Sequence, residues 1–429
     1  MQYTKIPEID SLAGIQCYST SFRGTRGIIK KNLSDFCVRE ILEPSFLQSP
    51  NFSNVKDNSH KFPLYVLEKQ NIDSNHAILK IQKKYNLKLK IIGIKDAKAI
   101  TFQYATSEKI KNISQIDLSN IKLSLKGFTK FPISKKMLLG NRFNIIINNI
   151  NSSDISEFLK EVKNIANFYG LQRFGSERLV THLVGKALIK NRYELAIDYL
   201  LSYTTKYDSK FSKEIREKSK DPNNYKYIIK YIPNGMDLEK KIITTLLEGK
   251  NHIHAIRSIP INIRRIFVNA YQSFIFNKCL SEAIISGEDI SECKNGDLCF
   301  EFKQPMTFGK IKKFEKSIDN PSNFTPAMFL VGYSYQPGKR RFDTICNKIL
   351  KSEGISKKDF YLKELQELSL QGGFRQTLLC CNNFVFLNNK KNNKINDIIN
   401  IKFNLPKGSY ATILLRELIK PKNPIKAGF

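Results

Sequence analysis

Residues 91–105 read Ile-Ile-Gly-Ile-Lys-Asp-Ala-Lys-Ala-Ile-Thr-Phe-Gln-Tyr-Ala, and this stretch decides the fold. Gly93 allows a tight backbone turn after an apolar run. From residue 100 onward apolar and polar side chains alternate, which predicts a second strand. Lys95 and Asp96 are therefore expected on a short connection between two strands, where a rigid sheet commonly presents reactive side chains.

Asp96 is the one acidic residue in a strongly basic window of the sequence. A lone carboxylate among cations is expected to stay ionised, and such a surface attracts a polyanion. An aspartate after a glycine turn can also serve as a helix cap or turn acceptor, so the turn alone leaves both roles open. The surrounding basic residues are Lys83, Lys84, Lys88, Lys90, Lys95 and Lys98.

Length and charge narrow the classes of protein. A chain of 429 residues with 41% apolar content is expected to fold into two or three domains. Its formal charge of +31 favours binding to nucleic acid or to an anionic membrane. No stretch reaches the roughly 18 apolar residues of a membrane span, and residues 1–12 contain acids and a proline where a signal peptide is apolar. We expect a soluble, cytoplasmic protein.

The cysteines and histidines predict no metal site. None of the eight cysteines form a Cys-x-x-Cys pair, so reduced and mostly buried thiols are expected. His252 and His254 flank Ile253 at a spacing that would place both on one face of a strand. Because no carboxylate or cysteine pattern accompanies them, we predict neither a metal nor a cofactor.

The N-terminal part of the chain predicts an α+β domain. Strands alternate with two helices, the first capped by Ser74 and the second by Ser153. This order favours one open, mixed and largely antiparallel sheet. The predicted strands are 27–30, 35–41, 62–69, 121–125 and 140–147, and the apolar stripe of the second helix is Ile155, Phe158, Leu159, Val162 and Ile165.

The middle of the chain differs in character from both ends. Helical patterns dominate residues 193–376, with a short strand at 297–302. Strands return at 377–387 and 398–404, on either side of an Asn/Lys-rich loop, and Ser409 is expected to cap a last helix. We predict one domain from residues 1–192 and 377–429, with a mainly helical domain, residues 193–376, inserted in it. The predicted helices of this domain include 193–203, 237–248 and 262–285.

Residues 167–175 read Asn-Phe-Tyr-Gly-Leu-Gln-Arg-Phe-Gly, which suits a loop that shapes a binding pocket. The ring of Tyr169 can stack on a nucleobase, the Asn167 amide can hold a carboxylate or a base edge, and Arg173 can pair with phosphate. An aromatic turn that packs against the preceding helix would read the same way. The stretch alone leaves both interpretations open.

Several stretches together resemble the TruD family of RNA pseudouridine synthases, in its archaeal and eukaryotic form. Residues 27–30 with Asp35-Phe36 are similar to its N-terminal signature, and residues 269–280 to a helix of its inserted domain. The resemblance extends from about residue 27 to 418, nearly the whole chain. The matching motifs are 93–103, 140–143 (Gly-Asn-Arg-Phe), 167–175 and 405–412 (Leu-Pro-Lys-Gly-Ser-Tyr-Ala-Thr).

The resemblance implies a pseudouridine synthase catalytic domain with an inserted TRUD domain, acting on tRNA. It places the catalytic aspartate on Asp96, a conserved lysine on Lys30, and the asparagine and base-stacking aromatic on Asn167 and Tyr169. Ser34 and Ser74 stand where the family commonly has an acid and a threonine, which bears on substrate details more than on the reacting groups.

The implied reaction converts uridine to its C-glycoside without a cofactor. The target nucleotide would be flipped out against Tyr169, and Asp96 would react at the sugar, either at C1′ as a nucleophile or by removing the 2′ proton. Lys30 would pair with that carboxylate. Lys95 and Arg173 are candidates for phosphate contacts, or else ordinary surface charges.

Other classes remain open at this stage. A non-catalytic RNA-binding protein on the same fold would use Asp96 as a turn cap, and composition does not separate it from the enzyme. A membrane-surface protein is disfavoured, because the chain lacks a long amphipathic helix with a basic face. Family members act on position 13 of tRNA and some relatives on other RNAs. The sequence predicts neither the modified uridine nor the oligomeric state.

Overall fold

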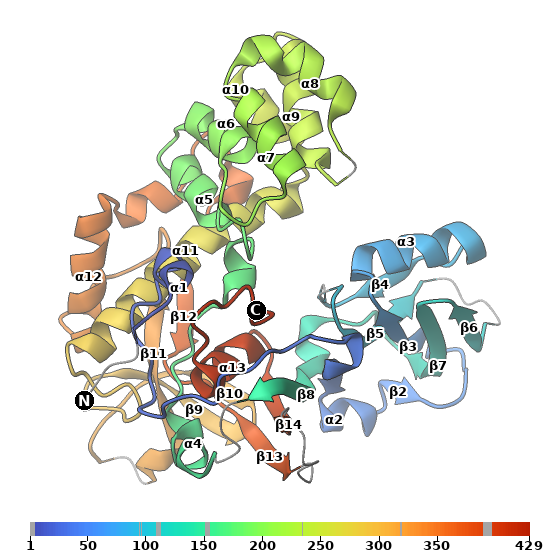
Figure 1. Cartoon of the computed structure of the whole chain (residues 1–429). Helices are drawn as coiled ribbons and strands as arrows, with labels where there is room; N and C mark the ends of the chain where they lie inside the picture. Colours follow the sequence, from blue (N-terminus) through green and yellow to red (C-terminus); the bar gives the residue numbers. More distant parts are fainter. Residues whose placement is uncertain are drawn as a thin grey trace.

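The computed structural model describes residues 5–93, 95, 97–108, 113–150, 155–233, 235–317, 320–388 and 397–429. The strands in these ranges form two sheets, and helices pack on both (Figure 1). This mixture is the α+β class predicted from the sequence, and the prediction is confirmed.

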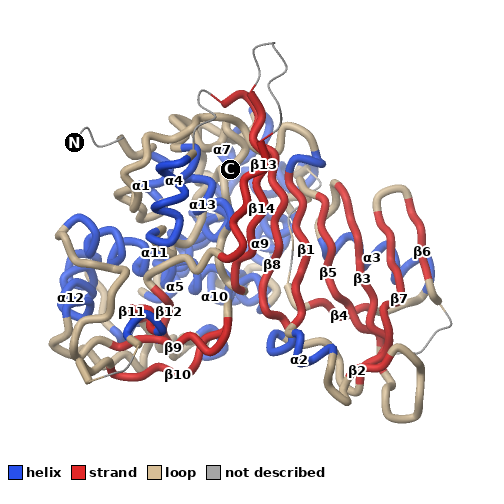
Figure 2. Tube along the Cα trace, turned by 90° about the horizontal axis from the view of Figure 1, so that it is seen from below, coloured by secondary structure: helices blue, strands red, loops and turns tan. Residues whose placement is uncertain are grey.

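The larger sheet has ten strands, in the order β13-β14-β8-β1-β5-β3-β7-β2, with β4 paired to β5 and β6 to β7. Figure 2 shows most of them side by side. The described pairs are antiparallel except β1 with β5, so the expected mixed, largely antiparallel sheet is confirmed. The strands are β1 (Phe36–Leu42), β2 (Phe52–Ser53), β3 (Phe62–Gln70), β4 (Leu89–Ile91), β5 (Ile100–Ser107), β6 (Gln115–Leu118), β7 (Ile121–Thr129), β8 (Leu138–Ile150), β13 (Asn382–Asn388) and β14 (Asp397–Pro406).

The parallel pair of strands brings two distant segments together. Cys37 of β1 lies beside Ile100 of β5. Because the two strands run in the same direction, the segments that lead into them arrive at the same edge of the sheet. One segment carries Lys30 and the other carries Lys95.

The smaller sheet and most helices come from the middle of the chain. Helices α6–α10, here called the helical lobe, project away from the larger sheet (Figure 1). The smaller sheet has the order β10-β9-β11-β12. Its strands are β9 (Leu298–Gln304), β10 (Thr307–Lys313), β11 (Phe324–Leu330) and β12 (Gly373–Gln376). The helices are α1 (Glu8–Leu12), α2 (Pro44–Leu47), α3 (Ser74–Tyr85), α4 (Ser156–Glu161), α5 (Thr181–Ile189), α6 (Tyr193–Ser202), α7 (Lys210–Lys218), α8 (Tyr225–Tyr231), α9 (Asp237–Leu247), α10 (His252–Ser258), α11 (Ile261–Ile285), α12 (Arg341–Glu353) and α13 (Ala411–Ile419).

The two larger of three apolar cores in the described residues hold these layers together. In the first, Leu188 of α5 and Leu280 of α11 belong to the same buried cluster as Leu414 of α13. In the second, α3 packs Ala77 and Ile81 onto the β3–β7 half of the larger sheet. The first core thus includes residues from both predicted domains, and the domain boundaries at residues 192 and 376 stay a prediction.

Two predicted helix caps are wrong by one residue. Asp73, not Ser74, caps α3, because its carboxylate accepts hydrogen bonds from the N–H groups of Asn75 (2.9 Å) and His76 (3.1 Å). Before α13 the capping position is Tyr410 rather than Ser409. Ser74 lies one residue after the N-cap of α3, and Ser409 lies one residue before the N-cap of α13.

The predicted helix from Ser153 is also shorter than expected. Ser153 lies outside the described residues, and α4 changes to a 3-10 turn at Val162. The Ile165 carbonyl accepts a hydrogen bond from Leu379 N–H at 2.8 Å, which replaces helical pairing by strand-like pairing. Leu159, assigned to the apolar stripe, is 44% exposed.

Three further local predictions need correction. Within residues 27–30, Ile28 forms a single β-bridge to Asn148, and the positive φ of Lys30 (56°) ends any extended run. His252 and His254 lie in the first turn of α10, not on a strand, because Asn251 caps this helix by accepting from His254 N–H at 3.1 Å. The strand expected over 377–387 begins only at β13.

The expected burial of the cysteine thiols holds only in part. All eight cysteines lie in described segments and are free thiols, although only Cys279, Cys299 and Cys346 are fully buried.

The buried histidine His182 leads to a prediction of how the free energy of unfolding depends on pH. This residue of α5 is buried, with its ring stacked on Phe274 (4.9 Å), and burial lowers its pKa from 6.5 to about 4. The unfolded chain binds the proton near pH 6.5 and the folded chain only near pH 4. The contribution to stability is therefore complete above pH 6.5 and is lost as the pH falls to about 4.

We expect His182→Phe, which keeps a ring but cannot titrate, to flatten this part of the profile. Urea denaturation from pH 7 to 4 should show a loss in the wild type that exceeds the loss in the variant by up to roughly 3 kcal/mol. Parallel profiles for the two proteins would contradict the assignment.

Candidate active site

A row of buried polar side chains crosses one face of the larger sheet. The register places Glu40 of β1 opposite Asn141 of β8, and Arg39 beside Phe102, so that Glu40 and Gln103 are neighbours. All three polar residues, Asn141, Glu40 and Gln103, are buried. A buried charge is costly unless it is paired, so this row needs a partner.

Lys95 provides that partner. Its Nζ donates to Asn141 Oδ1 at 2.8 Å and lies 3.2 Å from Glu40 Oε1. The other oxygen of Glu40 accepts from the backbone N–H of Tyr104 at 2.8 Å. The ammonium of Lys95, whose side chain is 17% exposed, is therefore directed at the sheet, where it pairs with the buried carboxylate of Glu40. Its contact with a phosphate stays a prediction.

The backbone around Lys95 is fixed by side chains from three directions. The Ser74 hydroxyl accepts from Lys95 N–H (2.9 Å) and donates to Gln103 Oε1 (2.5 Å). The Gln103 amide donates to the Gly93 carbonyl at 2.7 Å. The buried ammonium of Lys69 donates to the carbonyls of Ile72 (2.8 Å) and Lys95 (3.2 Å). The loop is thus held at Gly93 and on both sides of the Lys95 residue.

Asp96 follows directly in this loop but lies outside the described residues. Lys30 lies in the segment before β1, half-buried, with its Nζ 4.8 Å from the centre of the Phe36 ring. The parallel strands β1 and β5 bring this segment and the loop to one edge of the sheet. The fold therefore brings the Lys30 segment near the loop that contains the predicted catalytic residue.

Asn167 lies in the second predicted motif, where it holds an arginine. Its Oδ1 accepts from an Nη of Arg375 at 2.7 Å, and its backbone carbonyl accepts from Arg375 Nε at 3.0 Å. The Asn167 amide nitrogen donates to the Gln376 carbonyl (3.1 Å). Both residues are buried. The side chain of Asn167 is thus engaged with β12 in this structure.

Arg375 in turn covers the ring of Tyr169. The guanidinium carbon lies 4.0 Å from the ring centre, a cation–π distance, while Arg173 is farther away at 5.4 Å. Burial lowers the pKa of Arg375, and the nearby Tyr169 and Tyr410 oppose that shift. Phe276 and Tyr410 meet the Tyr169 ring nearly edge-on, at 5.6 and 5.9 Å. Only 7% of Tyr169 is exposed.

The backbone of Tyr169 is held by the helix α11. Asn277 Oδ1 accepts from Tyr169 N–H at 2.8 Å, and the Asn277 amide donates to the Tyr169 carbonyl at 3.0 Å. The same amide donates to the carbonyl of Ala13 at 2.9 Å. One fully buried side chain thus joins the helix to the second motif and to the N-terminal segment.

The two halves of the site are connected through β8 and β14. Asn141, which binds Lys95, pairs with Leu405 of β14. At the next position a Cβ on Gly140 would lie 2.2 Å from the Leu405 carbonyl oxygen, so the approach of the strands requires glycine. Beyond β14 the Gly408 carbonyl accepts from Arg375 at 3.0 Å. A continuous chain of contacts therefore joins Lys95 to Asn167.

Sequence reasoning missed Glu40 and Arg375. Glu40 carried a signal, because it alternates with Phe36 and Val38 on the apolar face of a predicted strand, where an acid needs a partner. Arg375 had none, since its neighbours Gly373 and Phe374 show no pattern that marks a buried cation.

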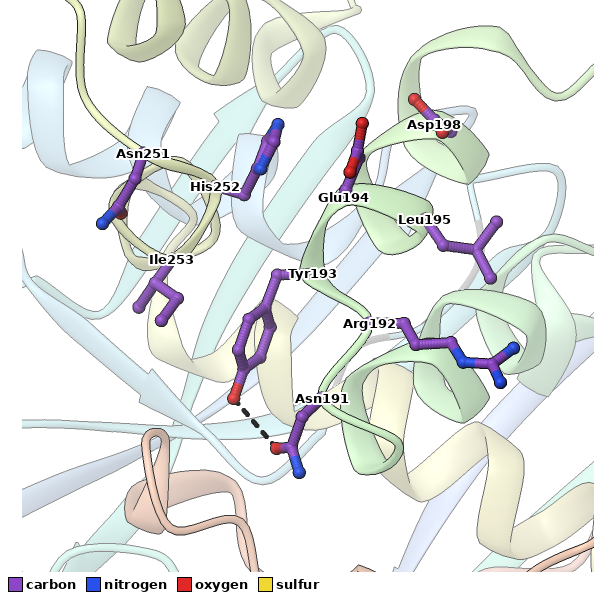
Figure 3. A pocket seen from close by; sticks show the side chains of 9 residues that line it. All are labelled: Asn191, Arg192, Tyr193, Glu194, Leu195, Asp198, Asn251, His252 and Ile253. Carbon is purple, nitrogen blue, oxygen red and sulfur yellow. Dashed lines mark hydrogen bonds between the residues drawn. The ribbon is translucent and has the colours of Figure 1, made fainter.

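A separate hollow of about 580 Å³ opens in the helical lobe, between the start of α6 and α10 (Figure 3). None of the predicted site residues line it. Its lining includes Glu194 and Asp198, and burial together with Glu194 raises the pKa of Asp198. The Tyr193 hydroxyl donates to Asn191 Oδ1 at 3.0 Å across its lower side. An acid pair does not suit a polyanionic ligand.

Among the residues that the structure describes, no group of three or more His, Cys, Asp and Glu side chains could hold a metal ion. Likewise, no helix in the described ranges is long and apolar enough to cross a membrane.

Comparison with known proteins places this fold in one class, the RNA pseudouridine synthases. The family model for tRNA pseudouridine synthase D (TruD) matches residues 12–418, and the chain belongs to this family. This confirms the family, the enzyme class and the tRNA substrate predicted from the sequence.

Individual relatives agree over the full length. A protein of Pyrobaculum islandicum is 31% identical over 99% of both chains, and one of Archaeoglobus fulgidus is 30% identical over 96% of this chain and 99% of its own. Both carry the name "Probable tRNA pseudouridine synthase D". The crystal structure of a TruD protein from Methanosarcina mazei is 27% identical and superposes with a TM-score of 0.77 over 99% of this chain and all of its own.

The buried ion pair allows a test by double substitution. Lys95→Met should lower the free energy of unfolding by about 3 kcal/mol, because it leaves the Glu40 carboxylate buried without a counter-charge. Lys95→Met combined with Glu40→Gln should recover most of that loss. Denaturation in urea measures both.

Lys98→Met is the matched control, because Lys98 is exposed in the same loop. It should change stability by less than about 0.5 kcal/mol. A double variant no more stable than Lys95→Met alone would show that the two charges are not coupled.

Proposed function

We propose that the protein converts a uridine of tRNA, the one at position 13, to pseudouridine with Asp96 as the catalytic residue, in the cytoplasm and without a cofactor. The observation that carries this proposal is the loop anchored by the buried Lys95–Glu40 pair. Anchoring on both sides of Lys95 supports a loop that holds its side chains in one geometry, as a reacting carboxylate requires.

The reaction requires three changes at the flipped nucleotide. The bond from C1′ to N1 breaks, the uracil turns over, and C5 joins C1′. C5 then loses its proton and N1 gains one, so the product is an isomer of the substrate. Aspartate has a reference pKa of about 3.9, so the proposal takes Asp96 to react as a carboxylate at neutral pH. It acts either on C1′ as a nucleophile or on the 2′ proton as a base. Lys30, from the segment that reaches the same edge of the sheet, would pair with it.

The second motif would position the base. Arg375 already lies over the Tyr169 ring, so the target base would meet the exposed part of the Tyr169 ring or displace Arg173 from it. Asn167 would act by holding Arg375 in place, rather than by touching the uracil. Arg173, half-buried beside the ring, would contact the phosphate of the flipped nucleotide. Burial strengthens these contacts because water is excluded.

We further propose that residues 193–376 form a TRUD domain inserted in a catalytic domain of residues 1–192 and 377–429. The inserted domain would bind the rest of the RNA. The formal charge of +31 supports an RNA ligand, and RNAs other than tRNA would fit the same electrostatics. A non-catalytic RNA-binding protein on this fold is the alternative.

Asp96→Asn separates the two functions. The variant should form no detectable pseudouridine in an unmodified tRNA transcript, because an amide neither attacks C1′ nor removes the 2′ proton under these conditions. Its Kd for the transcript should change less than about threefold. Chemical mapping of pseudouridine at nucleotide resolution measures the first quantity and also identifies the uridine. Full activity of Asp96→Asn would contradict the assignment of Asp96 as the catalytic residue. A wild type that binds tRNA but forms no pseudouridine would favour the non-catalytic alternative.

Salt dependence tests the electrostatic part of the proposal. A plot of log Kd for tRNA against log salt concentration should have a slope of about 0.7 to 0.9 per phosphate contact. Fluorescence anisotropy at several potassium chloride concentrations provides the data. A flat profile would exclude phosphate contacts as the main source of affinity.

A further inference from the structure

The far end of the helical lobe exposes two aromatic rings side by side. Tyr227 and Tyr231 lie one helical turn apart on α8, and their ring centres are 4.8 Å apart with a 40° tilt. They are 51% and 56% exposed. The opposite side of the helix is anchored by the buried Tyr225 and Ile228. The two exposed rings are therefore not needed to hold α8 in the lobe.

Basic side chains surround the rings. Lys218, from α7, places its Nζ 5.1 Å from the centre of the Tyr227 ring. Lys226 and Lys230 are exposed on α8 itself. We call Tyr227, Tyr231 and these three lysines the arm surface.

The segment around the arm surface is also basic. Residues 210–231 contain seven lysines and arginines and three acids. Two of those acids are already paired within the segment, Glu214 with Lys218 (3.0 Å) and Glu217 with Lys220. Helix α8 contains two lysines and no acid. The field over the exposed rings is thus positive.

We propose that the arm surface binds an unpaired nucleotide of the tRNA, with a base stacked on the tyrosine rings and the flanking phosphates held by Lys226 and Lys230. This rests on the proposed function in that the ligand is tRNA. The contact is separate from the loop that carries Asp96, since α8 lies in the lobe that projects from the sheet (Figure 1).

Charge complementarity selects RNA over other partners. Exposed aromatic rings interleaved with lysines are the combination that single-stranded nucleic acid uses, because bases stack on the rings while cations follow the backbone. An apolar partner would have to desolvate three ammonium groups around two rings. A nucleic-acid partner instead neutralises them.

A set of paired substitutions tests the proposal. Tyr227→Leu with Tyr231→Leu keeps apolar area but removes both π faces, whereas Tyr227→Phe with Tyr231→Phe keeps them. We expect the leucine pair to raise the Kd for an unmodified tRNA transcript about tenfold or more, and the phenylalanine pair less than about threefold. In turnover the loss should fall on KM rather than kcat.

Tyr333 and Tyr361 provide the matched control. They are 41% and 48% exposed, and their rings meet edge-on at 89° with centres 5.9 Å apart. Tyr333→Leu with Tyr361→Leu should leave the Kd within about twofold of wild type. Thermal melts check folding, and if the double variant melts early, Tyr231→Leu alone carries the same test.

Binding is measured without catalysis, so the two proposals can fail separately. If the variant Tyr227→Leu with Tyr231→Leu binds tRNA more weakly than wild type, and the wild type forms no pseudouridine, the arm surface is supported and the enzymatic mechanism is contradicted. Equal Kd values for the leucine pair and wild type, beside normal pseudouridine formation, would overturn the arm surface and leave the rings to a protein partner. An equal loss in the Tyr333/Tyr361 control would overturn it as well.

Discussion

One buried ion pair sets the position of the candidate active site. Lys95 and Glu40 lose their hydration when the loop closes on the sheet, and their mutual attraction and the Asn141 and Tyr104 hydrogen bonds must compensate. An apolar pair would hold a loop without defining one geometry, because apolar contacts are not directional. The Lys95 ammonium is directed by both partners, through the 2.8 Å hydrogen bond to Asn141 and the 3.2 Å ion pair with Glu40. The groups that hold the loop lie on three strands, β8, β1 and β5, and these strands therefore fix its position.

The second half of the site uses the same principle with different groups. Asn167 fixes a buried guanidinium, and that guanidinium is spread over the Tyr169 ring. A planar cation that stacks and donates several hydrogen bonds in fixed directions suits this task better than a lysine would. The aromatic ring is thus already oriented in the structure, as the proposed stacking of a base on it would require, because a preorganised group loses less conformational entropy on binding.

Local patterns in the sequence predicted local structure well. Strand 35–41 was observed at Phe36–Leu42 and helix 237–248 at Asp237–Leu247, because alternation and helical spacing are set by neighbouring residues. The failures involve partners far along the chain. Ile165 leaves its helix to pair with Leu379, and Lys95 turns to Glu40, 55 positions earlier. The motifs identified which stretches mattered, but they could not show that Arg375, from the end of the middle block, joins Asn167. Asp96 itself lies outside the described residues, so its role rests on its neighbours.

Asn277 has a mechanical consequence. The side-chain amide of Asn277 pairs with the Tyr169 peptide as a neighbouring strand would. It accepts a hydrogen bond from the Tyr169 N–H and donates one to the Tyr169 carbonyl. Helix α11 is 25 residues long and packs on α5, which in turn contacts α6 at the base of the helical lobe. A rotation of α11 about its axis would have to carry the Tyr169 peptide with it or break both bonds at once. Helix α11 therefore couples the helical lobe to Tyr169. A force that a large ligand exerts on the lobe would be transmitted to the aromatic ring.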